Sequence, residues 1–198
     1  MKIGEVIMLA TNLQPFLMGI VVSVLVGAAL TLPISSAAIC AAFGLTGLAG
    51  GAAVAGCCAQ MIGFAVMSFK ENGWGGLVSQ GIGTSMLQMG NIIKNPRIWI
   101  APIVTSAITG PVATCLFKLQ MNGTAVSSGM GTCGFVGQIG VYSGWANDVA
   151  AGTKSAITMM DWAGLILISF VLPAVICPLI NWLLKKAGWV KDGDMKLQ

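Results

Sequence analysis

Uncharged polar side chains that could bind a neutral solute gather in two glycine-rich stretches of the chain. The first stretch covers residues 69–90 and the second covers residues 117–140. The motif at residues 81–85 (GIGTS) returns 48 residues later at residues 129–133 (GMGTC), which indicates an internal repeat. Amides and hydroxyls hydrogen-bond to hydroxyl groups without carrying charge themselves, so they suit a hydroxyl-rich solute such as a carbohydrate better than an ion. We therefore expect the two stretches to build one binding site.

The candidate site residues combine these polar side chains with glycines that interrupt the helices. A broken helix exposes backbone amides and carbonyls, which a solute can satisfy. Glu71 is the only acid between residues 6 and 147, and it could bind a sugar hydroxyl or a proton, or be an ordinary loop carboxylate beside Lys70. The candidate substrate-binding residues are Gln60, Glu71, Gln80, Gly83, Thr84, Ser85, Gln88, Asn91, Ser128, Gly131, Thr132 and Gln138.

Other polar and aromatic residues have simpler interpretations. Trp99 and Trp145 could stack on a sugar face, but tryptophans at the ends of apolar segments are more often anchors at the membrane interface. Asp148 and Asp161 are interpreted as loop acids. Gly83→Val and Gly131→Val are each predicted to abolish ligand binding, because the two glycines align in the repeat.

The composition argues against independent catalysis, metal binding and nucleic-acid binding. There is no histidine, which removes the usual general base and the commonest metal ligand. The six cysteines form no CxxC pair, and the ten Lys and Arg residues form no basic stripe interleaved with aromatic residues. We expect no catalytic residue, no metal and no cofactor, and at most an enzyme role as the membrane component of a larger system.

The chain is too apolar to be a soluble domain. It contains 56% hydrophobic and 8% charged residues, whereas soluble domains contain about 25% charged residues. We therefore expect an all-α integral membrane protein with about four transmembrane helices and two re-entrant glycine-rich hairpins. Residues 1–184 would form one polytopic domain, with repeat units at about 51–97 and 98–145. Residues 185–198 would form an exposed, charged tail.

The positions of the spans follow from the long apolar runs, each about 20 residues long. The spans are predicted at residues 15–32, 47–69, 98–116 and 162–184. Residues 34–50 are apolar but short, and could be a thin helix or a segment that turns back within the membrane. Small residues recur at every fourth position from Gly47 to Gly63, a pattern typical of close helix packing.

Charge predicts the orientation. If both glycine-rich stretches enter and leave on one side, seven Lys and Arg residues share a side, and only Lys118 and Lys154 lie on the other. The positive-inside rule then makes the C-terminus cytoplasmic. The two copies would be an inverted repeat. If the stretches cross fully, the copies would be parallel and the charges would be divided less cleanly; we favour the inverted arrangement.

Several runs resemble a known bacterial membrane family. They are LTLPISSAAI (30–39), the stretch 55–88, NPRIWIAPIVTSAITGP (95–111) and GMGTCGFVGQIG (129–140). They resemble the IIC-type family of the phosphotransferase system that includes perfringolysin regulator-like proteins. Members of that family are longer, so the chain is similar to their C-terminal part or to a short variant. The resemblance implies a sugar-permease-like component whose relatives receive phosphate from separate IIA and IIB proteins.

These observations lead to one favoured function and two alternatives. We expect a multi-pass protein of the bacterial inner membrane that translocates a neutral solute, a sugar, across the lipid bilayer, and forms a homodimer. One alternative is a membrane sensor or regulator that binds a small ligand without transporting it. The other is a structural subunit of a larger permease. The sequence identifies neither the solute nor the energy source.

Overall fold

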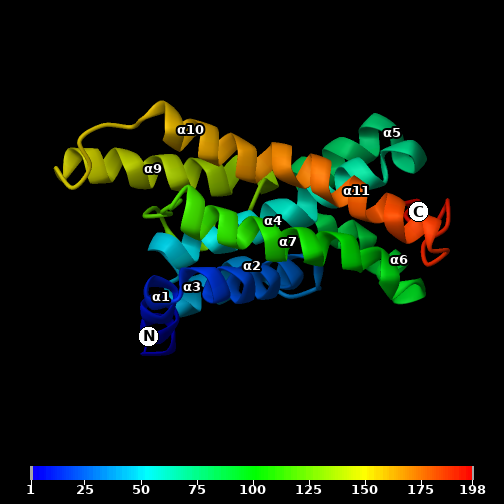
Figure 1. Ribbon diagram of the computed structural model, residues 1–198, viewed down its shortest axis with the longest axis horizontal. Helices are drawn as coiled ribbons and strands as arrows, with labels where there is room; N and C mark the ends of the chain where they lie inside the picture. The colour runs from blue at the N-terminus through cyan, green and yellow to red at the C-terminus, as the bar shows by residue number, and fades with distance from the viewer. Residues whose placement is uncertain (1, 198) are drawn as a thin grey trace.

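The computed structural model describes residues 2–197 and is an elongated bundle of helices, most of which follow its long axis (Figure 1). Among these residues there is no β-strand, only an isolated bridge between Gly47 and Met121. The all-α prediction is therefore confirmed. In chain order the elements are α1 (Lys2–Leu13), α2 (Pro15–Thr31), α3 (Ser36–Phe43), α4 (Gly47–Met67), α5 (Phe69–Val78), η1 (Ser79–Gly83), η2 (Ser85–Gln88), α6 (Met89–Lys94), η3 (Pro96–Trp99), α7 (Ile100–Pro111), η4 (Val112–Leu116), α8 (Ala125–Ser128), η5 (Cys133–Phe135), α9 (Val136–Ala150), α10 (Met159–Ile166), η6 (Leu167–Val171) and α11 (Leu172–Lys186).

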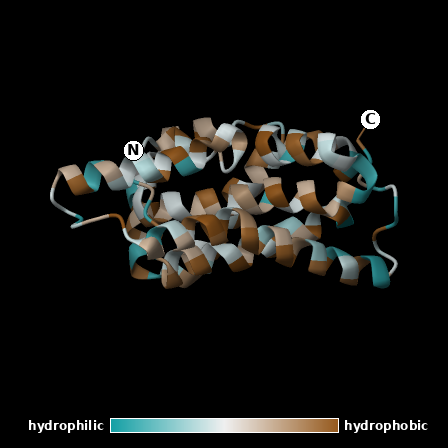
Figure 2. Cartoon of the chain, turned by 90° about the horizontal axis from the view of Figure 1, so that it is seen from above, coloured by the Kyte–Doolittle hydropathy of each residue, from teal (hydrophilic) through white to brown (hydrophobic). Residues whose placement is uncertain are grey.

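Three continuous helical segments are long and apolar enough to span a membrane. They are Gly47–Met67, Pro96–Leu116 and Met159–Lys186. Hydrophobic residues dominate the length of the bundle, and hydrophilic residues gather mostly at its two ends (Figure 2). Membership of the membrane class follows from the length and composition of these helices, which have 21 to 28 residues where about 20 suffice to cross a hydrocarbon core.

The fourth predicted span is a shorter apolar helix than the other three. Helix α2 has 17 residues and ends at Thr31, because the following Leu32 is extended and Pro33 cannot continue the helix. Helix α3 then begins at Ser36, after Ser35 has capped it by accepting from the Ala38 N–H, and it runs back so that Phe43 lies against Gly4 of α1. The structure therefore has three helices of spanning length rather than four, and α2 with α3 forms a shorter helical pair.

Helix α4 is the centre of the bundle, and its small residues allow close contact with several partners. A methyl group added at Gly56 would lie 1.9 Å from the carbonyl oxygen of Ser23 in α2. The same addition at Gly51 would meet the carbonyl oxygen of Leu119 at 1.8 Å, and at Gly63 it would meet the Cys177 sulfur at 2.7 Å. The small residues of α4 thus face three different parts of the bundle, where van der Waals packing stabilises helix association.

Both glycine-rich stretches fold as helical hairpins. The first runs inward through α5 and η1, turns at the extended residue Thr84, and returns through η2 and α6 to the same end of the bundle (Figure 1). The second runs inward through α8 and returns through α9, with Gly140 packed on Ser127 and Gly144 packed on Asn122. The second hairpin opens at the end opposite the C-terminus (Figure 1).

The end of the chain is partly buried, although an exposed tail was expected. After α11 the chain turns back at Gly188, where φ is +72°, and lies against the first hairpin. Val190 is 2% exposed and Met195 is fully buried. Residues 187–197 therefore pack as part of the folded domain.

Candidate functional site

The tips of the two hairpins touch inside the bundle. The Thr132 hydroxyl, in the second hairpin, donates a hydrogen bond to the Gly81 carbonyl oxygen of the first at 2.6 Å. Both residues are buried. The glycine-rich stretches, which enter from opposite ends, therefore meet at one place, which we call the hairpin junction.

The two aligned glycines of the repeat have different surroundings. Gly131 has a φ of +53°, and a methyl group there would lie 2.6 Å from Cβ of Cys57. Gly83 has a φ outside the left-handed region, and a methyl group there would meet nothing within 4 Å. The paired prediction for these glycines therefore needs revision, because only Gly131 is restricted by conformation and by space.

Gln60 lies at the centre of a buried polar cluster beside the junction. Its Oε1 accepts hydrogen bonds from the Trp99 indole at 2.8 Å and from the Thr31 hydroxyl at 3.2 Å. Its Nε2 donates to the Ser106 hydroxyl at 3.3 Å, and Thr31 also pairs with the hydroxyl of Ser85 at 2.9 Å. The cluster contains no charge, as the sequence predicts for a site that holds a neutral solute.

A chain of three amides, Gln80, Gln88 and Asn91, holds the arms of the first hairpin together. Gln80 donates to Ser68 at 2.8 Å, and Gln88 donates to the Gln80 carbonyl oxygen at 2.8 Å. Asn91 donates to the Gln88 carbonyl oxygen, also at 2.8 Å. Each side-chain amide donates to a group earlier in the sequence, and the bond from Gln88 to Gln80 joins the inward arm of the hairpin to the returning arm.

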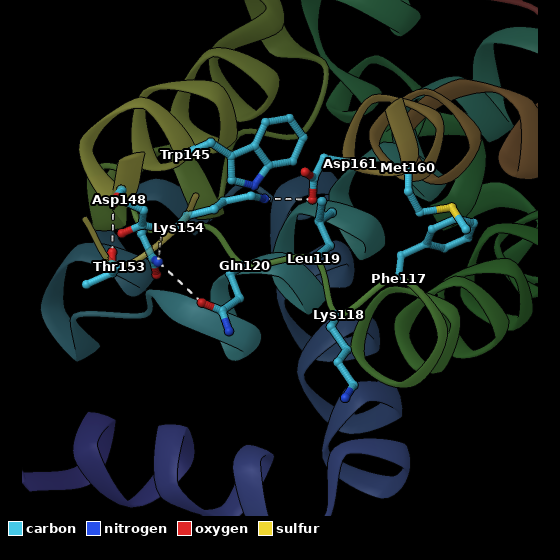
Figure 3. A pocket seen from close by; sticks show the side chains of 11 residues that line it. Phe117, Lys118, Leu119, Gln120, Trp145, Asp148, Thr153, Lys154, Met160 and Asp161 are labelled. Atoms are coloured by element: carbon cyan, nitrogen blue, oxygen red, sulfur yellow. Dashed lines mark hydrogen bonds and ion pairs between the residues drawn. The ribbon is translucent and has the colours of Figure 1, made fainter. Parts of the chain in front are cut away.

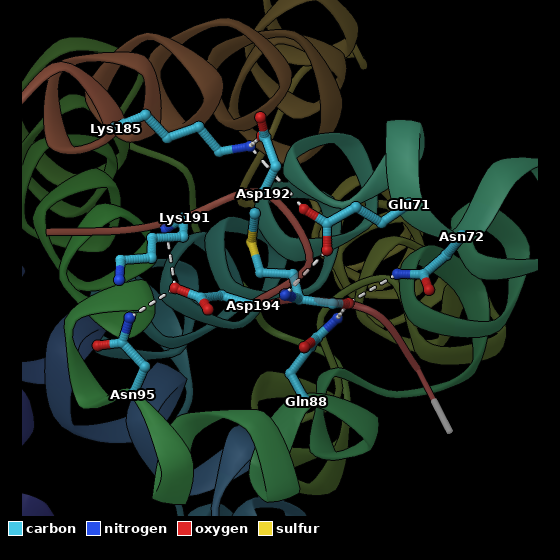
Figure 4. A network of polar contacts seen from close by, with 9 residues as sticks. Glu71, Asn72, Gln88, Asn95, Lys185, Lys191, Asp192 and Asp194 are labelled. Carbon is cyan, nitrogen blue, oxygen red and sulfur yellow. Dashed lines mark hydrogen bonds and ion pairs between the residues drawn. The ribbon is translucent and has the colours of Figure 1, made fainter. Parts of the chain in front are cut away.

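The C-terminal segment binds to this chain of amides through its backbone (Figure 4). The Met195 N–H donates to Glu71 Oε2 at 2.9 Å, and the Met195 carbonyl accepts from Gln88 at 2.9 Å and from Asn72 at 2.8 Å. The second oxygen of Glu71 is buried, lies 3.8 Å from Lys185 Nζ, and accepts no hydrogen bond within residues 2–197. Glu71 therefore holds the C-terminal segment, so the prediction of a solute-binding role for it needs this segment to move.

Gln88→Ala should lower the melting temperature of the purified protein. The change removes the bridge between Gln80, Asn91 and Met195 and leaves buried polar atoms unpaired, at a cost of about 1–3 kcal/mol. In a chain of this size each kcal/mol corresponds to roughly 2–4 °C. Asn147→Ala, at an exposed position, is the matched control. An unchanged melting temperature for Gln88→Ala would show that the amide chain does not stabilise the hairpin.

The remaining predicted residues lie around the second hairpin and the turn of the first. Ser128 donates to the Leu45 carbonyl at 2.6 Å, and Thr84 accepts from the Met86 N–H at 3.2 Å. Gln138 donates to Ser169 at 3.0 Å, while its buried Oε1 accepts no hydrogen bond from residues 2–197. The Gln138 oxygen is thus a buried acceptor that a solute hydroxyl could satisfy.

Most of the predicted residues divide between the junction and the first hairpin, and the polar side chains at the centre of each group are buried. Gln60, Thr132 and Ser85 are fully buried near the junction, whereas Gln80 and Gln88 are fully buried beneath the C-terminal segment. Their hydrogen bonds are made to other side chains of the bundle or to the backbone. A solute can reach them only when the hairpins separate.

A polar cavity lies at the other end of the bundle, where the sequence predicts no site. The cavity has a volume of about 420 Å³ and includes Asp148 and Asp161, for which the sequence predicts only the role of loop acids (Figure 3). The two acids are separated in the sequence and belong to no repeat, so the sequence alone does not indicate that they share a cavity.

Comparison with known proteins identifies a family. A protein-family model described as "Phosphotransferase system, EIIC" matches residues 1–197, nearly the whole chain. No curated protein and no solved structure matches the chain.

Proposed function

The chain belongs to the EIIC family of the phosphotransferase system and is an integral membrane protein with a permease-like role. From this family membership we propose that the protein translocates a neutral carbohydrate. The observation that carries the proposal is the contact between the hairpin tips, from Thr132 to Gly81, beside an uncharged polar cluster. Interrupted helices that meet inside a membrane domain are typical of transporter binding sites. Their broken backbones and buried amides supply hydrogen bonds without supplying charge.

The closed junction suggests how the solute would pass. When the two tips separate, the bond from Thr132 to Gly81 breaks, and each group needs a new partner. A sugar hydroxyl can accept from Thr132 and donate to the Gly81 carbonyl, so the solute replaces the bond that opening removes. The unpaired oxygen of Gln138 offers a further acceptor nearby on the second hairpin. Separation toward one end and then the other would move the solute across.

The distribution of charge supports the proposed orientation. Lys70, Lys94 and the lysines of the C-terminal segment belong to elements at the end where the chain finishes, whereas Lys118 and Lys154 belong to the opposite end (Figure 1). The positive-inside rule makes the first end cytoplasmic. We propose an inverted arrangement of the two hairpins in the bacterial inner membrane, with separate IIA and IIB phosphocarriers acting at this cytoplasmic end.

A homodimer is also proposed. Three helices of spanning length and two hairpins are few for enclosing a solute path. Ile82, Phe135 and Ile139, at or near the hairpin tips, are 39%, 42% and 60% exposed. A second copy packed over the tips would shield the irregular backbone of the turns from lipid, where unpaired backbone groups are costly.

Flux through reconstituted vesicles tests the proposal. Wild-type protein should increase the uptake of at least one radiolabelled sugar above that of protein-free vesicles. Thr132→Val should slow this uptake by about tenfold, which corresponds to about 1.4 kcal/mol, the scale of one hydrogen bond. Thr132→Ser keeps the donor and should retain the flux.

The control for this experiment is Thr124→Val, at an exposed position on the second hairpin. Within the described residues, the Thr124 hydroxyl pairs only with the Ser127 hydroxyl, at 2.8 Å. Wild-type protein that binds a sugar without increasing flux would replace the permease by a ligand-binding regulator. Equal flux in wild type and Thr132→Val would remove the junction from the solute path.

A further inference from the structure

The polar cavity overlooked in the sequence lies at the end of the bundle opposite the C-terminus. It is enclosed by the segment after η4, the end of α9 and the start of α10 (Figure 3). Its volume of about 420 Å³ falls within the range of pockets that bind small molecules. It is distinct from the hairpin junction, since none of the predicted site residues lines it.

The charges in the cavity balance. Two lysines, Lys118 and Lys154, and two acids, Asp148 and Asp161, line it. Lys154 Nζ lies 2.7 Å from Asp161 Oδ1, so one pair is already neutralised. A lining without net charge has no general preference for an anion or a cation, and it therefore suits an uncharged ligand.

The lining retains unused hydrogen-bonding capacity. The Lys154 ammonium has three donors, and Asp161 uses one of them. Asp148 Oδ2 accepts from Asn122 at 2.7 Å, whereas its Oδ1 accepts no hydrogen bond from residues 2–197. Gln120 is exposed in the cavity, and its carbonyl oxygen receives only a 3.3 Å contact from Asn122. Donors and acceptors thus lie side by side, as the recognition of hydroxyl groups requires.

The polar groups are held in place by the fold itself. The Asp148 carbonyl accepts from the N–H groups of Thr153 and Lys154, which fixes the loop after α9. Asp161 forms a capping box with Thr158 at the start of α10, so its carboxylate has a defined orientation. A site whose groups are already ordered loses less conformational entropy on binding.

An aromatic wall completes the cavity. Trp145 is 3% exposed, and Lys154 Nζ lies 5.1 Å from the centre of its ring (Figure 3). Phe117 lines another side. Sugars present apolar C–H groups as well as hydroxyls, so a cavity with aromatic and polar walls matches both parts of such a molecule.

We propose that this cavity is a recognition site for an unphosphorylated sugar or polyol, at the end of the bundle where solute arrives. The inference rests on the proposed function, because it assigns the first contact of the same solute before the hairpins separate. The two carboxylates accept from hydroxyl groups, while Lys154 and the amide of Gln120 donate to them. A phosphorylated sugar should bind more weakly, because a lining without net charge does not compensate for the hydration that a phosphate dianion loses on entering the cavity.

Calorimetric titration of the protein in lipid nanodiscs tests the site. The probes are glucose, galactose, N-acetylglucosamine and mannitol, with glucose 6-phosphate as the charged comparison, each up to about 10 mM, above the millimolar dissociation constants of weak sites. At least one neutral probe should bind. Its affinity should fall about tenfold or more in both Asp148→Asn and Gln120→Ala. Ser155→Ala, at an exposed position that does not line the cavity, should match wild type.

Each outcome decides the proposal. Absence of binding by all four neutral probes overturns it, as does unchanged affinity in both variants. Tighter binding of glucose 6-phosphate than of every neutral probe overturns the preference for uncharged ligands. If wild type binds a neutral probe through these residues but reconstituted vesicles show no flux, the recognition site stands and the permease function fails. If flux occurs and is unchanged in Asp148→Asn, the permease stands without this site.

Discussion

Gly131→Val should abolish carbohydrate flux and lower the melting temperature. The backbone of Gly131 has a φ of +53°, a conformation that a β-branched side chain strongly disfavours. The added Cβ would also lie 2.6 Å from Cβ of Cys57 and 2.8 Å from its carbonyl carbon, within the buried helix α4. The tip of the second hairpin must therefore move away from α4, and Thr132 then loses its contact with Gly81. Uptake into vesicles and thermal unfolding measure the two effects.

The matched control is the same change at the aligned position of the first hairpin. Gly83→Val adds the same side chain where nothing lies within 4 Å and where φ is outside the left-handed region. We expect near wild-type stability for Gly83→Val and a large loss for Gly131→Val. Equal losses in the two variants would mean that the repeat, rather than the local environment of each glycine, determines their importance.

Gly56→Ala should produce a large loss of stability although it adds only one methyl group. Its methyl group would lie 1.9 Å from the carbonyl oxygen and 2.6 Å from the carbonyl carbon of Ser23. These are backbone atoms, so α2 and α4 must separate, because no side chain can rotate away. Overpacking costs about 1–3 kcal/mol or more, which corresponds to roughly 2–12 °C in a chain of this size. Thermal unfolding in detergent, followed by light scattering, measures the loss.

A second glycine in a helix provides the control for this prediction. Gly75 lies in α5, and a methyl group there would meet nothing within 4 Å. Gly75→Ala should leave stability unchanged or raise it by up to about 1 kcal/mol, because alanine has the higher helix propensity. Because Gly56→Ala should lower stability and Gly75→Ala should not, the two variants together separate the effect of close packing from the effect of helix propensity. A destabilised Gly75→Ala together with an unaffected Gly56→Ala would contradict the close contact between α2 and α4.

Composition and local pattern were sufficient to predict the class of the protein. A chain with 8% charged residues and long apolar runs cannot cover a soluble globule, so the membrane assignment needed no tertiary information. The runs that resemble the IIC-type family also predicted the family, which the match over residues 1–197 confirms. The two glycine-rich stretches were recognised from their shared motif, although the inverted arrangement across a membrane stays a prediction.

The number of spanning helices could not be predicted from hydropathy alone. Residues 15–32 are apolar throughout, but α2 ends at Thr31 and α3 returns along it. Hydropathy records that a segment avoids water and does not record whether it crosses the membrane or pairs with its neighbour. Three of the four predicted spans are helices long and apolar enough to cross a membrane, and the fourth, α2, is shorter.

The partners of the polar residues were decided by the tertiary structure. Gln88 and Glu71 bind the backbone of Met195, more than 100 residues away, and Asp148 shares a cavity with Asp161. The sequence by itself determined the membrane class, the family and the uncharged polar stretches, since these follow from residue type and short-range spacing. Only the folded chain decided which glycine tolerates a side chain and which amide holds another, because such contacts depend on segments that packing brings together from distant parts of the sequence.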